Sequence, residues 1–386
     1  MKARVVHLIT KLELGGAQGN TLHTVRCLDR SRFSVALWAG DGGILNEEAA
    51  AIPELSFELI PPLVREINPL RDLQALLILR QKLKAEIKQF APLPVILHTH
   101  SSKAGILGRL AGRLAGVRRL VHTYHGFGFN PTQPGPLRAL FIGLERWAGG
   151  MSRALIAVSR ANLEQAVALG FCPREKIRLI RSGVALENFT RRNIDRPAKR
   201  RELGLKPDSP MVLMVACLKP QKSPLDFVRI AKQVTAAAPE VEFVLAGDGE
   251  LRPELEALVR ELGLTERFHL LGWRRDIPEL LWAADLLVLT SRWEGLPRVY
   301  PEALAAGLPV VGTAVDGAAE AVTEGETGYL FAPGDVAGMA GRVIALLRDP
   351  EQRARLSAAG PKRVAEFDIR RLVPAQEALY EELLSA

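Results

Sequence analysis

The feature that most constrains the fold of this chain is a repeated alternation between short apolar runs and longer segments with helical spacing. The helical segments include residues 68–90 and 101–116. Around them lie five apolar runs, ARVVHLI, FSVALWAG, VILHTH, RLVHTYH and RALIAVS. Buried strands that alternate with helices are typical of a parallel sheet covered by helices on both faces. The first half of the chain is therefore predicted to form an α/β domain.

The alternation stops at residues 181–210 and then resumes. That stretch is polar, basic and contains proline, so we expect a linker without a strand. Six further apolar runs follow it, MVLMVACL, VEFVLAG, RFHLLGW, DLLVLTS, PVVGTAV and GYLFAP. The sequence thus predicts two doubly wound, Rossmann-like domains that face each other across a cleft, with ligands at the carboxyl ends of the strands.

Composition excludes several classes of protein. The chain has 386 residues, 48% of them apolar, which is enough for two domains with full cores. Cys27, Cys172 and Cys217 are too few and too scattered for a disulfide framework, so we expect a reducing, cytoplasmic setting. The N-terminus enters an apolar run without a signal-peptide cleavage site, and no uncharged apolar stretch is as long as a membrane span.

The formal net charge of +8 is unevenly distributed along the chain. Residues 1–185 hold 25 Lys and Arg against 13 Asp and Glu, whereas the remainder holds more acidic than basic residues. A basic first half suggests an anionic partner, such as a nucleic acid, a phospholipid or a phosphorylated acceptor. The alternative is an ordinary solvated surface rich in arginine.

Two glutamates, Glu294 and Glu302, lie eight positions apart in the stretch TSRWEGLPRVYPEALAAGLPVV. We expect a helix to begin near Pro297 and Arg298 and to end before Gly307, which leaves Glu294 on the preceding loop. Carboxylates at this separation suit the two ends of one elongated ligand, with the helix N-terminus facing an anion between them. A nucleotide sugar fits this description. The alternative is that one glutamate is a surface helix residue and the other caps the helix.

The residues that follow this pair give the pattern a family context. They run through GLPVV at 307–311, a turn at Asp316–Gly317 followed by Glu320, and TGYL at 327–330. This order resembles that of the retaining GT-B glycosyltransferases of family 4, also called group 1 glycosyltransferases. The resemblance implies an acceptor-binding Rossmann-like domain over 1–190 and a nucleotide-sugar-binding one over 209–369. It also implies that a last helix, over 370–386, packs back on the first domain.

The resemblance assigns catalytic and binding roles to individual residues. Glu302 would hold the ribose of the donor, and Glu294 the transferred sugar. Lys222 would stabilise the departing diphosphate, and His125, in the segment HTYHGFGF, would contact the sugar from the first domain. The other positions that the resemblance places at the donor are Gly15, Gly16, Lys219, Gly247, Gly272, Trp273, Leu296 and Arg298.

One position departs from the family pattern. Members of the family usually pair an arginine with the lysine on the diphosphate, but the arginine position holds Cys217 here. Lys219 or Arg298 could supply the missing positive charge. No Asp-x-Asp and no cluster of metal ligands with metal-binding spacing occurs in the sequence, so we expect no metal and no cofactor besides the donor.

The function predicted from these features is transfer of a hexose from a nucleotide sugar, expected to be a UDP-sugar, to a glycan or lipid-linked acceptor with retention of configuration. We expect a role in bacterial cell-surface polysaccharide or lipopolysaccharide synthesis, and no nucleic-acid partner. Arginine-containing stretches at 105–120 and 134–150 could dock the first domain on an anionic membrane surface. The alternatives are a non-catalytic nucleotide-sugar-binding subunit and a sugar-nucleotide epimerase on the same scaffold.

Overall fold

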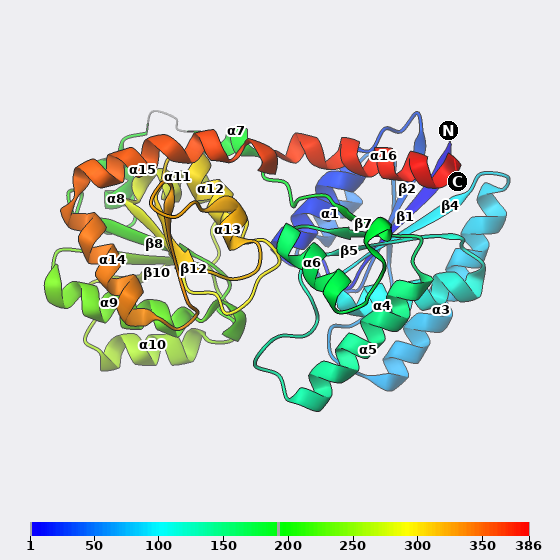
Figure 1. Cartoon of the computed structure of the whole chain (residues 1–386), viewed down its shortest axis with the longest axis horizontal. Coiled ribbons are helices and arrows are strands. Elements are labelled where there is room, and N and C mark those ends of the chain that lie inside the picture. Colours follow the sequence, from blue (N-terminus) through cyan, green and yellow to red (C-terminus); the bar gives the residue numbers. More distant parts are fainter. Residues whose placement is uncertain (1, 191–193, 386) are drawn as a thin grey trace. The chain divides into compact units, whose positions relative to one another are not determined.

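The computed structural model describes residues 2–190 and 194–385 and divides into two compact units. Unit 1 comprises residues 1–183 and 369–386, and unit 2 comprises residues 184–368. Each unit contains one parallel sheet with helices packed around it (Figure 1). The α/β architecture with two Rossmann-like sheets agrees with the prediction from the alternating pattern.

The sheet of unit 1 has seven parallel strands in the order β3-β2-β1-β4-β5-β6-β7. Its two sequential series run outward in opposite directions from the neighbouring strands β1 and β4, so the gap between them is the switch point at which such sheets bind ligands. The strands are β1 (Ala3–Ile9), β2 (Phe33–Ala39), β3 (Leu55–Leu59), β4 (Val95–His100), β5 (Arg119–Tyr124), β6 (Ala154–Ala157) and β7 (Ile177–Leu179).

Helices cover the sheet of unit 1 because they present small or apolar residues to it. In α4, a Cβ added at Gly108 would lie 2.6 Å from the Leu8 side chain, so glycine allows this helix to pack closely on the strands. The larger helix α3 begins where Asn68 Oδ1 accepts a hydrogen bond from the Arg71 backbone N–H, 3.1 Å away. The helices are α1 (Gly16–Cys27), α2 (Asn46–Ala50), α3 (Pro69–Phe90), α4 (Ser102–Ala115), α5 (Gly135–Met151) and α6 (Arg160–Ala168).

The last helix, α16 (Leu372–Ser385), belongs to unit 1 although it follows unit 2 in the sequence. Its Tyr380 hydroxyl lies 2.5 Å from His98 Nδ1 on β4, and its Leu383 carbonyl accepts a hydrogen bond of 2.8 Å from Arg119 Nε. These bonds, together with the burial of Tyr380, fix the C-terminal segment on the sheet of unit 1.

The sheet of unit 2 has six parallel strands in the order β10-β9-β8-β11-β12-β13, with its switch point between β8 and β11. Its strands are β8 (Met211–Val215), β9 (Glu242–Ala246), β10 (Phe268–Leu270), β11 (Leu286–Leu289), β12 (Val310–Thr313) and β13 (Gly328–Phe331). Its helices are α7 (Leu186–Phe189), α8 (Arg196–Glu202), α9 (Pro224–Ala237), α10 (Arg252–Glu261), α11 (Ile277–Ala283), α12 (Val299–Ala305), α13 (Ala318–Ala321), α14 (Val336–Arg348) and α15 (Pro350–Arg363).

The stretch expected to be a linker is more structured than its composition suggests. Within 181–210 lie α7 and α8, and Val184 forms an isolated parallel bridge with Asp368. Residues 191–193 of this stretch lie outside the described residues. The buried guanidinium of Arg200 donates to the Ala283 carbonyl and to Asp285, which attaches α8 to unit 2. The basic residues of α8 therefore include one with a structural role.

The expected basic surface on unit 1 also needs a correction. The arginines of the stretch 105–120 were expected to face a membrane surface or solvent. One of them, Arg109, is instead fully buried, and its guanidinium pairs with Glu145 of α5 at 2.8 Å. A buried arginine needs such a carboxylate partner, which a single sequence does not reveal.

Candidate functional site

The candidate site of unit 2 lies at its switch point, where the loops after β8 and β11 leave neighbouring strands. The loop after β8 ends in the short 3-10 turn Pro220–Lys222, and the loop after β11 carries Glu294 and leads into α12. Parallel strands release their loops at the same edge of the sheet. For that reason residues more than seventy positions apart in sequence come together there.

The first pair in this site is an ion pair between the Lys222 ammonium and the Glu294 carboxylate. The side chains are 19% and 7% exposed, respectively, so water screens the pair only partly. Ser291 Oγ donates to Glu294 Oε1 over 2.6 Å, and Gln221 Nε2 donates to Oε2 over 3.4 Å. Glu294 is thus held by three side chains from two loops.

The second carboxylate, Glu302, lies in the first turn of α12 with its side chain 15% exposed. The Arg298 guanidinium lies 3.8 Å from its Oε1. Burial raises the pKa of Glu302, and the positive charges of Arg298 and Lys222 oppose this effect. Lys222 therefore acts electrostatically on both glutamates. The structure brings together four of the predicted site residues, Glu294, Glu302, Lys222 and Arg298.

Asp316 is a member of this cluster that sequence reasoning treated only as part of a turn. Its Oδ2 accepts a hydrogen bond of 2.6 Å from the Glu294 backbone N–H. Burial, with the nearby Glu294 charge as a further cause, raises the pKa of Asp316 to about 6. Its backbone adopts a left-handed φ of 41°, which is uncommon for a residue with a side chain. Such strain is frequent at functional sites.

Ser291 and Gln221 were also missed by the sequence analysis. Their relevance depends on contact with Glu294, and neither belongs to a motif that the sequence displays. The only available signal is position, because Ser291 is the third residue before Glu294 and Gln221 immediately precedes Lys222.

Two glycine turns follow the strands β9 and β10. Gly247 has a φ of 146°, and a Cβ there would lie 1.9 Å from the Ala216 carbonyl oxygen. Its N–H donates to the Gly272 carbonyl over 2.8 Å, which ties together the loops after β9 and β10. Trp273 follows with half of its surface exposed, whereas Leu296 is buried. The loops after β9 and β10 lie at the carboxyl edge of the sheet of unit 2.

The position of the missing arginine is occupied by a partly buried cysteine. Cys217 lies between β8 and the 3-10 turn, and its thiol is not in a disulfide. Lys219 lies at the start of the turn, and its carbonyl accepts a hydrogen bond from the Lys222 N–H over 2.9 Å. Arg298, one of the two proposed replacements, contacts the cluster through Glu302.

Unit 1 holds the remaining predicted site residues at the carboxyl edge of its own sheet. Gly15 and Gly16 follow β1 and begin α1, with Gly15 extended and exposed. His125 directly follows β5 and is half-buried. It lines a small cavity together with His100, Asn20 and other residues from this unit.

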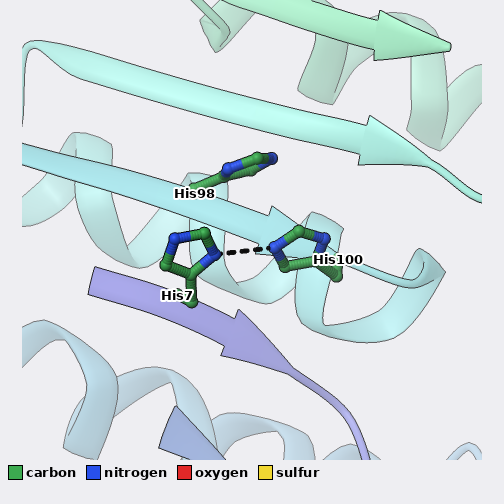
Figure 2. Close-up of side chains that lie close together, drawn as sticks. All are labelled: His7, His98 and His100. Carbon is green, nitrogen blue, oxygen red and sulfur yellow. Dashed lines mark hydrogen bonds between the residues drawn. The ribbon is translucent and has the colours of Figure 1, made fainter. Parts of the chain in front are cut away.

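A cluster of three buried histidines includes His100, which lines this cavity. Figure 2 shows His7 from β1 and both His98 and His100 from β4, with a hydrogen bond of 3.0 Å between His7 Nδ1 and His100 Nε2. Their ligand atoms lie within 4.8 Å of one another, which is a spacing that a metal ion could use. The sequence did not indicate this cluster, because His7 is more than ninety residues from the other two.

The hydrogen bonds of these rings argue against a metal site. His98 Nδ1 bonds to the Tyr380 hydroxyl, and His98 Nε2 bonds to Thr123 Oγ1, 2.7 Å away. His100 Nδ1 lies 3.1 Å from His125 Nε2. Five of the six ring nitrogens are therefore engaged, and a metal would have to displace several of these bonds.

Comparison with known proteins decides the family. Residues 14–188 match the family model described as Glycosyltransferase Family 4, and residues 195–363 match the model described as Glycosyl transferases group 1. A curated protein of Escherichia coli, named UDP-Gal:alpha-D-GlcNAc-diphosphoundecaprenol alpha-1,3-galactosyltransferase, is 33% identical over 99% of this chain and 98% of its own length. The chain belongs to the family 4, or group 1, glycosyltransferases.

Solved structures agree with this glycosyltransferase at the level of the fold. HepE of Anabaena, in complex with UDP-glucose, aligns with a TM-score of 0.80 over 98% of this chain and 99% of its own, at 24% identity. WaaG, described as a glycosyltransferase involved in lipopolysaccharide biosynthesis, aligns with a TM-score of 0.76 over 96% and 98% of the two chains, at 17% identity. The predictions of a GT-B fold and of glycosyltransferase family 4 are confirmed.

Proposed function

We propose that this glycosyltransferase transfers a hexose from a UDP-sugar to a glycan or lipid-linked acceptor, with retention of configuration and without a metal ion. The observation that carries the proposal is the cluster of Glu294, Glu302, Lys222 and Arg298 at the switch point of unit 2. The name of the E. coli relative supports UDP-galactose and a GlcNAc-diphosphoundecaprenol as the first donor and acceptor to test. The setting would be the synthesis of bacterial cell-surface polysaccharide or lipopolysaccharide.

Within this proposal the cluster holds the donor along its length. Glu302 accepts hydrogen bonds from the ribose hydroxyls, and Glu294 accepts them from the sugar. Lys222 carries three N–H donors, so it can keep its bond to Glu294 and still donate to a phosphate oxygen. Arg298 adds a second positive charge in place of the one that Cys217 cannot supply. Positive charge at the diphosphate stabilises the leaving group as it departs.

The reaction forms a bond between an acceptor oxygen and the anomeric carbon and breaks the bond from that carbon to the UDP oxygen. The departing diphosphate takes the electron pair of the broken bond, and the proton of the acceptor hydroxyl passes to it. His125, Gly15 and Gly16 are proposed to contact the donor from unit 1. Gly247, Gly272, Trp273, Leu296 and Lys219 are proposed to line the nucleotide side.

A lipid-linked acceptor would place the enzyme at the inner face of the cell membrane. Exposed apolar side chains on α3 support contact with a lipid surface, since Leu70 is 76% exposed and both Leu73 and Leu77 are 54% exposed. On α5, Leu140 and Trp147 are 57% and 50% exposed. Among the described residues, no helix has both the length and the hydrophobicity needed to cross a bilayer.

Vesicle sedimentation tests this membrane contact. We expect the wild-type protein to bind vesicles that contain anionic phospholipid, and the double variant Leu70→Gln/Leu73→Gln to bind more weakly. Ala319→Gln, at an exposed position in unit 2, serves as a control that should not change binding. Equal binding by the wild type and the double variant would refute a role for α3.

The transfer reaction is tested with purified protein, labelled UDP-galactose and GlcNAc-diphosphoundecaprenol. We expect a disaccharide product without added metal and with undiminished yield in a chelator. Because galactose is α-linked in UDP-galactose, retention predicts an α-anomeric proton in the NMR spectrum of the product. A β-linked product would contradict retention, and a chelator-sensitive rate would contradict metal independence.

The same mixture without acceptor distinguishes the two rival functions. An epimerase would convert UDP-galactose into another UDP-hexose, whereas a non-catalytic subunit would bind UDP-sugar without turnover. A broader panel of UDP-, GDP- and ADP-sugars in the presence of acceptor covers other donors. Failure of every donor to give product, despite binding, would favour the non-catalytic subunit.

A further inference from the structure

A chain of hydrogen bonds links three histidines in unit 1. His7 Nδ1 lies 3.0 Å from His100 Nε2, and His100 Nδ1 lies 3.1 Å from His125 Nε2. His7 and His100 are almost completely buried, and the first of the two bonds is drawn in Figure 2. His125 is half-buried and lines the cavity at the carboxyl edge of the sheet. The chain thus connects the interior of the sheet to a candidate site residue.

The number of protons on these rings restricts how the bonds can point. A neutral imidazole carries one N–H donor and one acceptor lone pair. Burial lowers the pKa of His7 to about 3 and holds the pKa of His100 well below its ordinary value, so both rings are neutral at pH 7. Because His100 has a single N–H, its two bonds run in the same direction along the chain. Either His7 donates to His100 and His100 to His125, or both bonds are reversed.

The positions of the two end rings, His7 and His125, distinguish the two directions. The Nε2 atom of His7 is buried and has no hydrogen-bond partner among the described residues. In the reversed arrangement this atom would carry an N–H with no acceptor, whereas in the forward arrangement it carries only a lone pair. In the forward arrangement the terminal N–H lies on His125 Nδ1, which is also buried, but His125 lines the cavity, where a water or substrate oxygen can accept it. The forward direction is therefore favoured.

The cavity favours the same direction. Side-chain oxygens of Asn20, Thr24 and Gln376 line it, are buried, and have no hydrogen-bond partner within the described part of the chain. Amide oxygens only accept hydrogen bonds. Arg181 and hydroxyl groups also line the cavity, but the two amide oxygens are complementary to an N–H on the His125 ring rather than to a second lone pair.

We propose that His7 and His100 are positioning residues that hold His125 as the tautomer protonated at Nδ1. In this tautomer His125 Nε2 accepts from His100, and Nδ1 is a hydrogen-bond donor. His125 would then act on a substrate hydroxyl or phosphate oxygen by donating a hydrogen bond, and not as a general base. The contact with substrate rests on the proposed function, whereas the tautomer does not.

Nuclear magnetic resonance on the whole protein reads the tautomer directly. The chain has seven histidines, so labelling with ¹⁵N-histidine gives a small set of signals. Long-range proton–nitrogen couplings show which ring nitrogen carries the proton, and His125→Gln assigns the His125 signals by their loss. We expect both His125 and His7 to be protonated at Nδ1. Protonation of His125 at Nε2 would overturn the proposal.

Two substitutions of His7 test whether the chain sets this tautomer. His7→Asn keeps an N–H donor near the position of Nδ1, whereas His7→Phe keeps a ring but removes the donor. We expect His125 to remain protonated at Nδ1 in His7→Asn and to become a mixture of tautomers in His7→Phe. Loss of one oriented hydrogen bond predicts a kcat about tenfold lower in His7→Phe, with recovery to within about twofold in His7→Asn.

The outcomes test the tautomer of His125 and the proposed sugar transfer separately. An unchanged His125 tautomer in His7→Phe would overturn the positioning role. Stoichiometric binding of Zn²⁺ by the wild type, lost in His7→Phe, would overturn it in favour of a metal site. If His7→Phe does not fold, the wild-type and His7→Asn spectra still decide the tautomer. Absence of sugar transfer with His125 protonated at Nδ1 would refute the proposed function alone.

Discussion

At the residue scale, the centre of the candidate site is the carboxylate of Glu294. It receives hydrogen bonds from Ser291 and Gln221 and an ion pair from Lys222, while its own backbone N–H donates to Asp316. A carboxylate with this many partners has little freedom to rotate. Such fixed orientation is what a residue that positions a sugar hydroxyl requires.

Replacement of Lys222 by methionine tests the proposed role of its charge. We expect Lys222→Met to lower kcat by about 10²–10³-fold, the usual effect of losing one preorganised group that stabilises developing charge. The free energy of unfolding should also fall by about 1–3 kcal/mol, because a buried carboxylate loses its charged partner. Lys362→Met, at an exposed position in unit 2, is the control and should change neither. Normal kcat in Lys222→Met would remove this residue from the mechanism.

Asp316 gives a prediction for pH dependence. Its pKa of about 6 in the folded protein lies above its ordinary value of 3.8, so the folded state holds the proton more tightly than the unfolded state. Tighter proton binding by Asp316 therefore contributes to the free energy of unfolding below about pH 4, and this contribution is lost as the pH rises through 6. It amounts to roughly 3 kcal/mol. Asparagine cannot ionise, so Asp316→Asn should gain stability relative to the wild type over this range.

Urea unfolding of the wild type and Asp316→Asn at pH 4.5, 6 and 7.5 measures this difference. Other titrating groups, such as Asp276, are present in both proteins and cancel in the comparison. A difference in unfolding free energy that stays constant from pH 4.5 to 7.5 would show that Asp316 has an ordinary pKa.

These residues also show what the sequence could and could not predict. The resemblance to family 4 predicted that Glu294, Glu302, Lys222 and Arg298 share a site, and the structure brings them together. The bond from Glu294 to Asp316 crosses two loops, and no spacing in the sequence indicates it. Their catalytic roles stay predictions, since they depend on a substrate.

At the scale of elements, strands buried on both faces were predicted well because continuous apolar runs mark them. The strands β3 and β7 were not predicted, since both lie at edges of the sheet of unit 1. The β3 sequence, LSFEL, alternates polar with apolar residues and is only partly buried, and β7 has three residues. Edge strands need less burial, so their sequences carry a weaker signal.

The turn after β9 is predicted to require glycine at position 247. Gly247→Ala places a Cβ against the Ala216 carbonyl at a φ that side chains rarely adopt, so we expect a loss of about 2–4 kcal/mol in unfolding free energy. Gly341→Ala, in α14 with open space around the added Cβ, is the matched control and should gain about 0.5–1 kcal/mol. Thermal unfolding of both variants measures the contrast. Equal unfolding free energies of the two variants would contradict the close approach of Gly247 to the Ala216 carbonyl.

At the scale of the whole molecule, each of the two units contains a parallel sheet with a switch point. The chain returns to unit 1 through α16. The double alternation in the sequence predicted two such sheets. The family resemblance implied a last helix on the first domain, but no pattern in the sequence indicates that this helix supplies Tyr380 to His98. That contact joins residues 282 positions apart, and only the folded chain reveals it.

The proposed function requires that the acidic and basic cluster of unit 2 binds a uridine nucleotide. Isothermal titration of UDP into the wild type, Glu302→Gln and the exposed control Glu254→Gln tests it most directly. We expect saturable, one-to-one binding that is about tenfold weaker in Glu302→Gln, equivalent to about 1.4 kcal/mol, and unchanged in Glu254→Gln. No binding by the wild type, or equal affinity in all three proteins, would contradict it.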